Sequence, residues 1–254
     1  MLEVEGVDIV RSNEVVIRRA TFTVEKGDYV GMVGPNGGGK TTLLRAILGD
    51  IPLRRGTIRL FGEDVSRFRR WGRVAYVSQD SINFDVQFPL TVRELVGLGR
   101  ARRENLGRRL RGEDWDSVGR AMDFMELTPL AGRRIGELSS GQKQRAFVAK
   151  ALVRDPEVLI LDEPVAGVDA TAMERFYQRI SDLNAERGMT VLLVSHDLTA
   201  VFCRMSKVVC VNRDVHFAPI TPDLDPNEVL RKGYGDHFHF VFHEHRCEGV
   251  FERR

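Results

Sequence analysis

The sequence predicts an α/β fold with a mixed, mainly parallel sheet, an antiparallel β part at the N-terminus and an inserted α-helical region. Two observations carry this prediction. Short continuous apolar runs at residues 158–161 and 190–194 alternate with segments of helical spacing, and this order implies parallel strands joined by right-handed crossovers. Between about residues 80 and 136 the apolar spacing is helical, which indicates the insert.

The N-terminal strands are expected first along the chain. Apolar runs at residues 2–10, 15–17 and 20–24 are separated by turn residues, a pattern typical of antiparallel strands. A turn at 25–28 leads into residues 29–33, a continuous apolar run of the kind buried on both faces of a sheet. A glycine-rich stretch follows, and then a helix is expected over 41–48, closed by Gly49.

The insert and the second half of the fold follow. Helices in the insert are indicated by the spacing of Val92, Leu95, Val96 and Leu98, and of Val118, Met122, Met125 and Leu127. After the insert, a helix over 141–153 precedes the strand at 158–161, and a helix over 170–186 precedes the strand at 190–194. The tail from Pro219 onward is rich first in proline and then in histidine and aromatic residues.

Composition and charge limit the function. The 254 residues are 43% apolar with a formal charge of +2, which excludes a disordered or fibrous chain and gives no electrostatic argument for nucleic-acid binding. The basic clusters at 67–73 and 100–111 are interpreted as solvated faces. No apolar run reaches the roughly 18–20 residues of a membrane span. The start lacks the basic region of a secretory signal, so a cytosolic chain is expected unless a partner holds it at a membrane.

A phosphate-binding loop is predicted between the strand at 29–33 and the helix at 41–48. The motif GxxxxGK[ST] is matched without a gap by Gly34, Pro35, Asn36, Gly37, Gly38, Gly39, Lys40 and Thr41. Glycines let backbone N–H groups turn around a phosphate, and the following helix adds its positive end. Lys40 is expected to reach the β- and γ-phosphates of ATP, Thr41 to coordinate Mg²⁺, and Thr42 to line the same site. These residues predict a P-loop NTPase core.

Two carboxylates end the strand at 158–161. Asp162 is expected at the carboxyl edge of the sheet, where ligands of open α/β folds bind, and there it would face Mg²⁺. Glu163 would polarise the water that attacks the γ-phosphate, a general-base role usually worth about 10²–10⁴-fold. Two acids after a strand are by themselves more often a solvated turn, and the phosphate loop is what favours the functional interpretation.

Further motifs resemble those of ABC transporter ATP-binding subunits over almost the whole chain. Leu138-Ser139-Ser140-Gly141-Gln142 resembles the signature sequence, Gln79 the Q-loop glutamine, Asp169 the D-loop aspartate and His196 the switch histidine. The resemblance implies a core at about 1–79 and 146–218, a helical subdomain with the signature at about 80–145, and a tail at about 219–254. This core would be RecA-like.

The resemblance also implies how the site works. Two copies would form a homodimer with ATP between them, and the signature residues Ser139, Ser140, Gly141 and Gln142, together with Asp169, would serve the nucleotide bound by the partner copy. Gln79 would sense Mg²⁺ and the attacking water. His196 would contact the γ-phosphate and hold Glu163 and the water in line.

The sequence departs from the family pattern in two places. Ser140 stands where glycine is commonest, and a small serine is expected to keep the turn functional. The family usually has an aromatic ring against adenine near Val10–Arg11, and none is present there. Arg11 either stacks its guanidinium group on adenine or is solvated.

The segment from Gln87 to Arg100 is similar to that of importers of zinc, manganese or related metals. This similarity implies uptake of a divalent metal cation through a separate membrane permease, which would dock near Phe88-Pro89, with an extracytoplasmic solute-binding protein in the complex. The ATPase would then lie at the cytoplasmic face of the cell membrane. Import of a ferric siderophore, haem or cobalamin, and a soluble ATPase acting on ribosomes or DNA repair intermediates, are the alternatives.

The tail alternates histidine and phenylalanine. His237, His239, His243 and His245 would share one face of an extended strand, with Phe238, Phe240 and Phe242 on the other. The histidines either bind Zn²⁺ weakly or are solvated while the phenylalanines pack.

Overall fold

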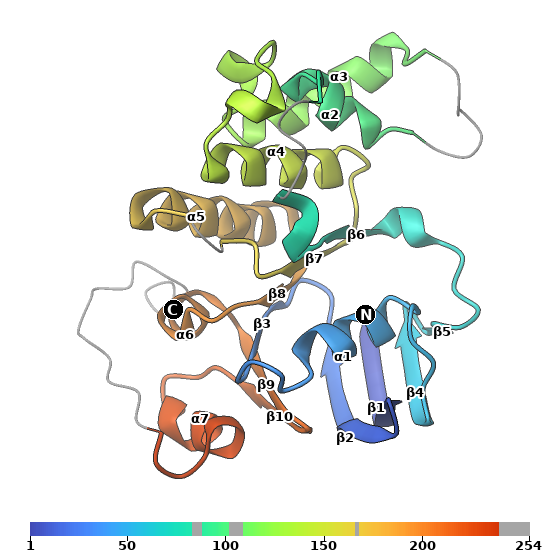
Figure 1. The fold of residues 1–254 in the computed structure, drawn as a ribbon, viewed down its shortest axis with the longest axis vertical. Helices are drawn as coiled ribbons and strands as arrows, with labels where there is room; N and C mark the ends of the chain where they lie inside the picture. The colour runs from blue at the N-terminus through green and yellow to red at the C-terminus, as the bar shows by residue number, and fades with distance from the viewer. Residues whose placement is uncertain (83–87, 102–108, 166–167, 239–254) are drawn as a thin grey trace. The chain divides into compact units, whose positions relative to one another are not determined.

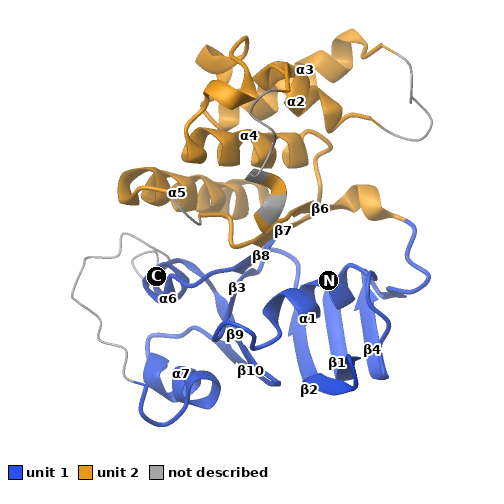
Figure 2. Ribbon diagram, viewed as in Figure 1, with its two compact units in different colours: residues 1–69, 190–254 blue, residues 70–189 orange. Residues whose placement is uncertain are grey.

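The structure, a computed structural model, describes residues 1–82, 88–101, 109–165 and 168–238 (Figure 1). The chain divides into two compact units (Figure 2): unit 1 is Met1–Arg69 with Thr190–Arg254, and unit 2 is Arg70–Met189. The α/β fold class predicted from the sequence is confirmed. The helical region expected at 80–145 belongs to unit 2, which also contains two strands and one further long helix.

Unit 1 begins with antiparallel strands. Their bounds are β1 Leu2–Arg11, β2 Glu14–Val24, β4 Arg55–Leu60 and β5 Glu63–Asp64. β1 pairs with β2 and β4, and β4 pairs with β5. The apolar runs at 15–17 and 20–24 lie on the single strand β2 rather than on two. A shift in register between Val7↔Ala20 and Ile9↔Ile17 inserts an extra residue into β2, so that Ile17 and Ala20 are both fully buried.

The parallel part of unit 1 surrounds β3, Tyr29–Val33. β3 runs parallel to β8, Thr190–Val194, on one side and to β9, Lys207–Asn212, on the other. β10, Asp214–Pro219, is antiparallel to β9 and touches β2. Every residue of β3 and β8 is buried, as the continuous apolar runs predicted. The helices of unit 1 are α1 Lys40–Ile47, α6 Leu198–Arg204 and α7 Pro226–Tyr234.

The described part of unit 2 contains a pair of parallel strands, four α-helices and several short 3₁₀ turns. β6, Val74–Val77, pairs with β7, Val158–Asp162. The helices are α2 Val92–Leu98, α3 Gly112–Phe124, α4 Ser140–Leu152 and α5 Ala170–Arg187, with short 3₁₀ turns at η1 Trp71–Arg73, η2 Gln79–Ile82, η4 Thr128–Leu130 and η5 Ile135–Glu137. The apolar positions expected to face the core do so, except Leu98, which lies at the end of α2 and is 51% exposed.

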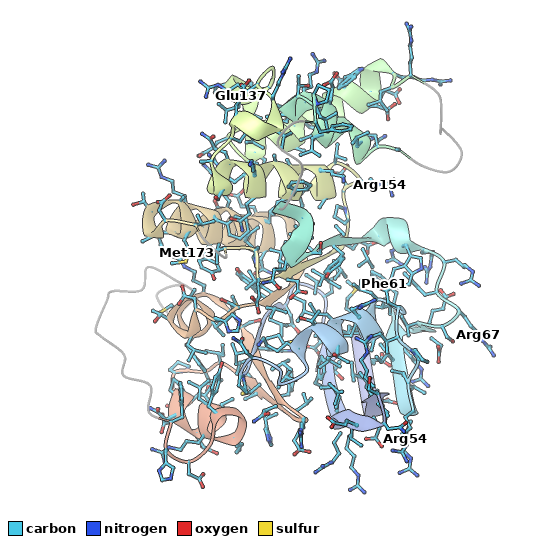
Figure 3. All side chains as sticks on the ribbon, viewed as in Figure 1. Arg54, Phe61, Arg67, Glu137, Arg154 and Met173 are labelled. Atoms are coloured by element: carbon cyan, nitrogen blue, oxygen red, sulfur yellow. The ribbon has the colours of Figure 1, made fainter. Side chains whose placement is uncertain are left out.

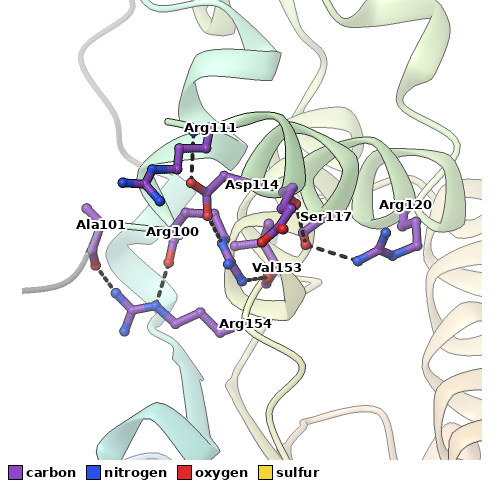
Figure 4. Close-up of polar contacts among 10 residues, drawn as sticks. Arg100, Ala101, Arg111, Asp114, Ser117, Arg120, Val153 and Arg154 are labelled. Atoms are coloured by element: carbon purple, nitrogen blue, oxygen red, sulfur yellow. Dashed lines mark hydrogen bonds and ion pairs between the residues drawn. The ribbon is translucent and has the colours of Figure 1, made fainter. Parts of the chain in front are cut away.

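A polar cluster joins the ends of three helices in unit 2 (Figure 4). Arg100, just after α2, donates to Asp114 of α3 at 2.8 Å and to the carbonyl of Val153, just after α4, at 3.3 Å. Arg154 donates to the carbonyls of Gly99, at 2.6 Å, and Ala101. Three chain segments are thereby joined to one another by hydrogen bonds in addition to their apolar packing.

The basic clusters behave differently from one another. In the cluster at 67–73, Arg67 extends away from the ribbon of unit 1 and is exposed, as is Arg54, which lies outside both clusters (Figure 3). Arg73 is instead paired with both carboxylate oxygens of Glu157, with Nη2–Oε2 at 2.7 Å. The interpretation of 100–111 as a solvated face is wrong for Arg100, whose side chain is mostly buried. Its charge is tolerated there because it forms an ion pair with Asp114. Within the described residues no helix has the length and apolar character needed to cross a membrane.

Candidate nucleotide-binding site

The predicted phosphate loop, residues 34–41, joins β3 to α1 in unit 1. α1 begins at Lys40, and Gly39 caps it with a left-handed φ of 104°. Gly37 also has positive φ, 75°, and Gly38 donates its N–H to the carbonyl of Pro35 at 3.0 Å to close a turn. The sequence order strand, glycine loop, helix is therefore present, and the positive end of α1 lies at the loop.

Two of the glycines are required because the loop runs against β9. A Cβ on Gly34 would lie 2.0 Å from the carbonyl oxygen of Val211, and one on Gly38 would lie 2.6 Å from the same oxygen. The carbonyl of Gly38 in turn accepts from the N–H of Arg213 at 3.0 Å. The rear of the loop is thus held against backbone, and a side chain at either position would displace it.

Lys40 is buried, at 6% exposure, and its Nζ donates to the carbonyls of Gly34 at 2.9 Å and Pro35 at 3.1 Å. Its charge is thereby held inside the loop. Thr41 is exposed at the first turn of α1 and Thr42 is half-buried. Pro35 and Asn36 are at the tip of the loop, where Pro35 accepts from both Gly38 and Lys40.

His196 lies at the same edge of the sheet as the loop. Met32 of β3 pairs with Val194 of β8, so both strands end together, and Gly34 and His196 each follow two residues later. The His196 side chain is exposed, while the preceding Ser195 is buried and accepts from the N–H of Asp197 at 2.9 Å. Asp197 caps α6. The predicted switch histidine is therefore presented by a short, well-capped turn.

The last turn of α7 supports the loop from behind, a feature that sequence reasoning missed. The N–H of Gly34 is donated to the hydroxyl of Tyr234 at 3.0 Å, and the Tyr234 ring stacks on Phe238 with 4.6 Å between centroids. Cys210 of β9 is buried beside it, and burial raises the pKa of its thiol to about 11, against the opposing effect of nearby Lys40. Nothing in the local sequence connects residue 234 with residue 34.

In unit 2 the structure brings together the predicted Q-loop and the two acids. Val77 pairs with Leu161, so β6 and β7 end at the same edge, and Gln79 and Asp162 both lie just beyond this pair. Asp162 is buried and accepts from the hydroxyl of Tyr76 at 3.4 Å. Glu163 follows with a left-handed φ of 47°, a conformation that non-glycine residues adopt rarely and often at functional sites. Gln79 is exposed at the start of η2.

The predicted signature residues form the start of α4. Ser139 caps the helix: its Oγ accepts from the N–H of Gln142 at 3.3 Å, and Gln142 Oε1 accepts from the N–H of Ser139 at 3.1 Å. Ser139 and Ser140 are exposed. The positive end of a 13-residue helix is therefore presented with exposed hydroxyls.

The predicted D-loop aspartate is the cap of α5. Asp169 Oδ1 accepts from the N–H of Ala172 at 2.9 Å. The start of α5 packs closely against the start of α4. A Cβ built on Gly141 would lie only 3.2 Å from the Cβ of Ala172. The glycine of the predicted signature thus allows a close helix contact within unit 2, which a larger residue would tighten by a few tenths of an ångström. Ala166 and Gly167, which precede Asp169 in the predicted D-loop, lie outside the described residues.

Three further predicted features have a defined place. Arg11 is exposed at the β1–β2 hairpin, opposite Glu14. Phe88 is 52% exposed, which suits a docking surface, although Gln87 lies outside the described residues. His237 lies in a turn after α7, while His239, His243 and His245, with Phe240 and Phe242, lie outside the described residues. The metal-binding hypothesis for the tail stays a prediction.

Comparison with known proteins agrees with this arrangement. The sequence model of the ABC transporter family matches residues 17–166. The chain is 42% identical over 217 residues to the zinc uptake system ATP-binding protein ZurA of Listeria innocua, covering 85% of this chain and 84% of that protein. It is 34% identical to the manganese transport system ATP-binding protein MntB of Listeria monocytogenes, covering 92% and 96%.

A solved structure shares the fold as well. It is that of cbiO1 from Clostridium perfringens, part of the ABC transporter complex cbiONQ, which has a TM-score of 0.78 and 25% identity and covers 91% of this chain and 93% of that one. The family model matches more than half of the chain and the relatives match most of it, and the chain therefore belongs to the ABC transporter family.

Proposed function

We propose that this chain is the ATP-hydrolysing subunit of an importer that drives a divalent metal cation, zinc or manganese, through a separate membrane permease. The observation that carries the ATPase part is the phosphate loop, with buried Lys40 inside it and helix α1 behind it. The metal part is supported by the relatives, a zinc uptake protein and a manganese transport protein that match this chain over most of their length.

The residues fit the triphosphate of ATP. Gly34 and Gly38 leave no room for side chains behind the loop, and Gly37 and Gly39 have positive φ, so the loop is shaped by backbone alone. Lys40 holds a positive charge within it, which suits the β- and γ-phosphates. On nucleotide binding, its Nζ would donate to phosphate oxygens, and these hydrogen bonds join opposite charges, whereas the carbonyls of Gly34 and Pro35 are neutral acceptors.

Each unit carries oxygen donors of the kind that Mg²⁺, a hard cation, prefers. The ligands proposed from the sequence are the Thr41 hydroxyl of unit 1 and the Asp162 carboxylate and Gln79 side-chain carbonyl of unit 2. When bound, the cation would neutralise charge on the phosphate oxygens. The Tyr76 hydroxyl donates to Asp162 Oδ2 over 3.4 Å, a long hydrogen bond.

The roles in hydrolysis follow from the chemistry of each group. Glu163 would accept the proton of the attacking water, and His196 would hold the water and the γ-phosphate oxygen in line. The exposed start of α4, with Ser139 and Ser140, would bind the γ-phosphate held by a second copy of the chain. Gly141, Gln142 and Asp169 support that surface through the two helix starts.

The transport partners follow from the proposed role. A permease would dock near exposed Phe88-Pro89, with a solute-binding protein on the other side of the membrane, and the ATPase would lie at the cytoplasmic face. No nucleic-acid partner is expected for this chain.

The cargo is tested by growth of a strain that lacks this chain under separate limitation of zinc, manganese and ferric chelate. We expect a defect under zinc or manganese limitation that the wild-type chain restores and the Lys40→Ala chain does not. A defect confined to ferric-chelate limitation would overturn the metal assignment. Purification of the wild-type chain with ribosomes rather than with a membrane protein would overturn the transport role.

A further inference from the structure

The C-terminal helix α7 contacts the phosphate loop through one side chain. β3 ends at Val33, so the N–H of Gly34 lies beyond the strand ladder, and the hydroxyl of Tyr234 accepts it at 3.0 Å. The carbonyl of the same Gly34 accepts from Lys40 Nζ at 2.9 Å. The Tyr234 hydroxyl and the Lys40 ammonium group are therefore joined through the backbone of one residue.

The position of Tyr234 is itself fixed. The carbonyl of Gly233 accepts from Asn212 Nδ2 at 2.7 Å, and a Cβ on Gly233 would lie 2.1 Å from Cys210 Sγ, so the last turn of α7 is seated directly on β9. The Tyr234 ring also stacks on Phe238. β9 is the strand whose Val211 carbonyl limits Gly34. The tyrosine and the loop thus rest on the same support.

We propose that Tyr234 is a positioning residue for nucleotide binding: its hydroxyl fixes the N–H of Gly34, and the carbonyl of the same residue, in the next peptide unit, holds Lys40 where the phosphates bind. This inference rests on the proposed function, since it requires that residues 34–41 bind nucleotide. The hydroxyl would act through Gly34 rather than on ATP itself. Its effect is to keep the empty loop in the shape that binds, so that less of the binding free energy is used to order the loop.

The test is Tyr234→Phe, which removes the hydroxyl and keeps the ring that stacks on Phe238. A neutral hydrogen bond contributes about 0.5–1.5 kcal/mol, so the dissociation constant for ATP without Mg²⁺ is expected to rise between about twofold and tenfold. KM for ATP should rise by a similar factor with kcat nearly unchanged, because nucleotide restores the loop. Amide exchange at Gly34 in the nucleotide-free chain should become faster, which is a readout independent of hydrolysis.

Asp225→Ala is the matched control on the same helix. Asp225 caps α7 by accepting from the N–H of Asn227 at 2.9 Å, so its loss weakens the helix without touching the loop. The proposal requires that this variant keeps the wild-type affinity for ATP. An equal loss of affinity in both variants would assign the effect to helix stability and overturn the proposal.

The other outcomes are also decisive. If the wild-type chain binds ATP and Tyr234→Phe binds it equally well, this inference is wrong and the proposed function stands. If the wild-type chain binds no ATP, the proposed function fails and this inference fails with it.

Discussion

Gly34→Ala tests whether β9 dictates the shape of the phosphate loop. The new Cβ would lie 2.0 Å from the Val211 carbonyl oxygen, whereas carbon and oxygen atoms in contact are usually about 3.3 Å apart or more. Gly34 also has a φ of 147°, which L-residues rarely adopt. Backbone strain of this kind costs about 1–3 kcal/mol and overpacking costs about 1–3 kcal/mol more. We expect a loss of about 3 kcal/mol in the free energy of unfolding.

The assay is thermal unfolding of the nucleotide-free chain, with Gly37→Ala as the control. Gly37 has positive φ, 75°, but a Cβ there meets nothing within 4 Å, so the cost is only that of the conformation, about 1 kcal/mol. At about 2–4 °C per kcal/mol, Gly34→Ala should lower Tm by roughly 6–12 °C and Gly37→Ala by roughly 2–4 °C. Equal shifts in the two variants would refute the argument that contact with β9 sets the loop.

Other variants test the remaining assignments. Glu163→Gln should keep ATP binding and lose about 10²–10⁴-fold in turnover; unchanged phosphate release would exclude the base role. Lys40→Ala should weaken ATP binding at least about tenfold, measured by titration, and an unaltered affinity would contradict the loop assignment. Asp114→Ala removes the partner of mostly buried Arg100 and should cost about 1–3 kcal/mol in chemical unfolding. Glu228→Ala, whose partner is exposed Lys232, should cost under about 0.5 kcal/mol; equal losses in these two would show that the Arg100 pair is not structural.

The sequence was sufficient for the elements whose residues are buried on every side. The strands at 29–33 and 190–194 are continuous apolar runs, and the structure begins and ends them at those residues. The fixed spacing between glycine and Lys40 predicts a loop followed by a helix start, and the structure has both at these residues, while phosphate binding there stays a prediction. The capping roles of Ser139 and Asp169 are also local, and both fit the helix starts that the sequence predicts.

The contacts behind the loop could not be predicted from the sequence. Tyr234 reaches Gly34 across 200 residues, and the helix that carries it begins at Pro226 in a segment that reads as proline-rich tail. The glycine at 34 was expected to serve phosphate binding, yet the Val211 carbonyl is what excludes a side chain there. Such contacts depend on how elements that are distant in sequence pack together, and local residue patterns carry no information about that packing.

The bulge in β2 shows the same limit on a smaller scale. Arg18 and Arg19 look like a break between two apolar runs, and the strand passes through them because one extra residue restores the inward direction. Prediction from strict inward and outward alternation cannot anticipate a bulge, because the extra residue breaks the period of two.

The close approach of Gly141 to Ala172 has an evolutionary consequence. A Cβ at position 141 would lie only 3.2 Å from the Cβ of Ala172, so side chains at the two positions compete for the same space between the helices. A homologue with a larger residue at either position would have to shift one helix start or carry a smaller residue at the other position, so the sizes of these residues should vary together across the lineage.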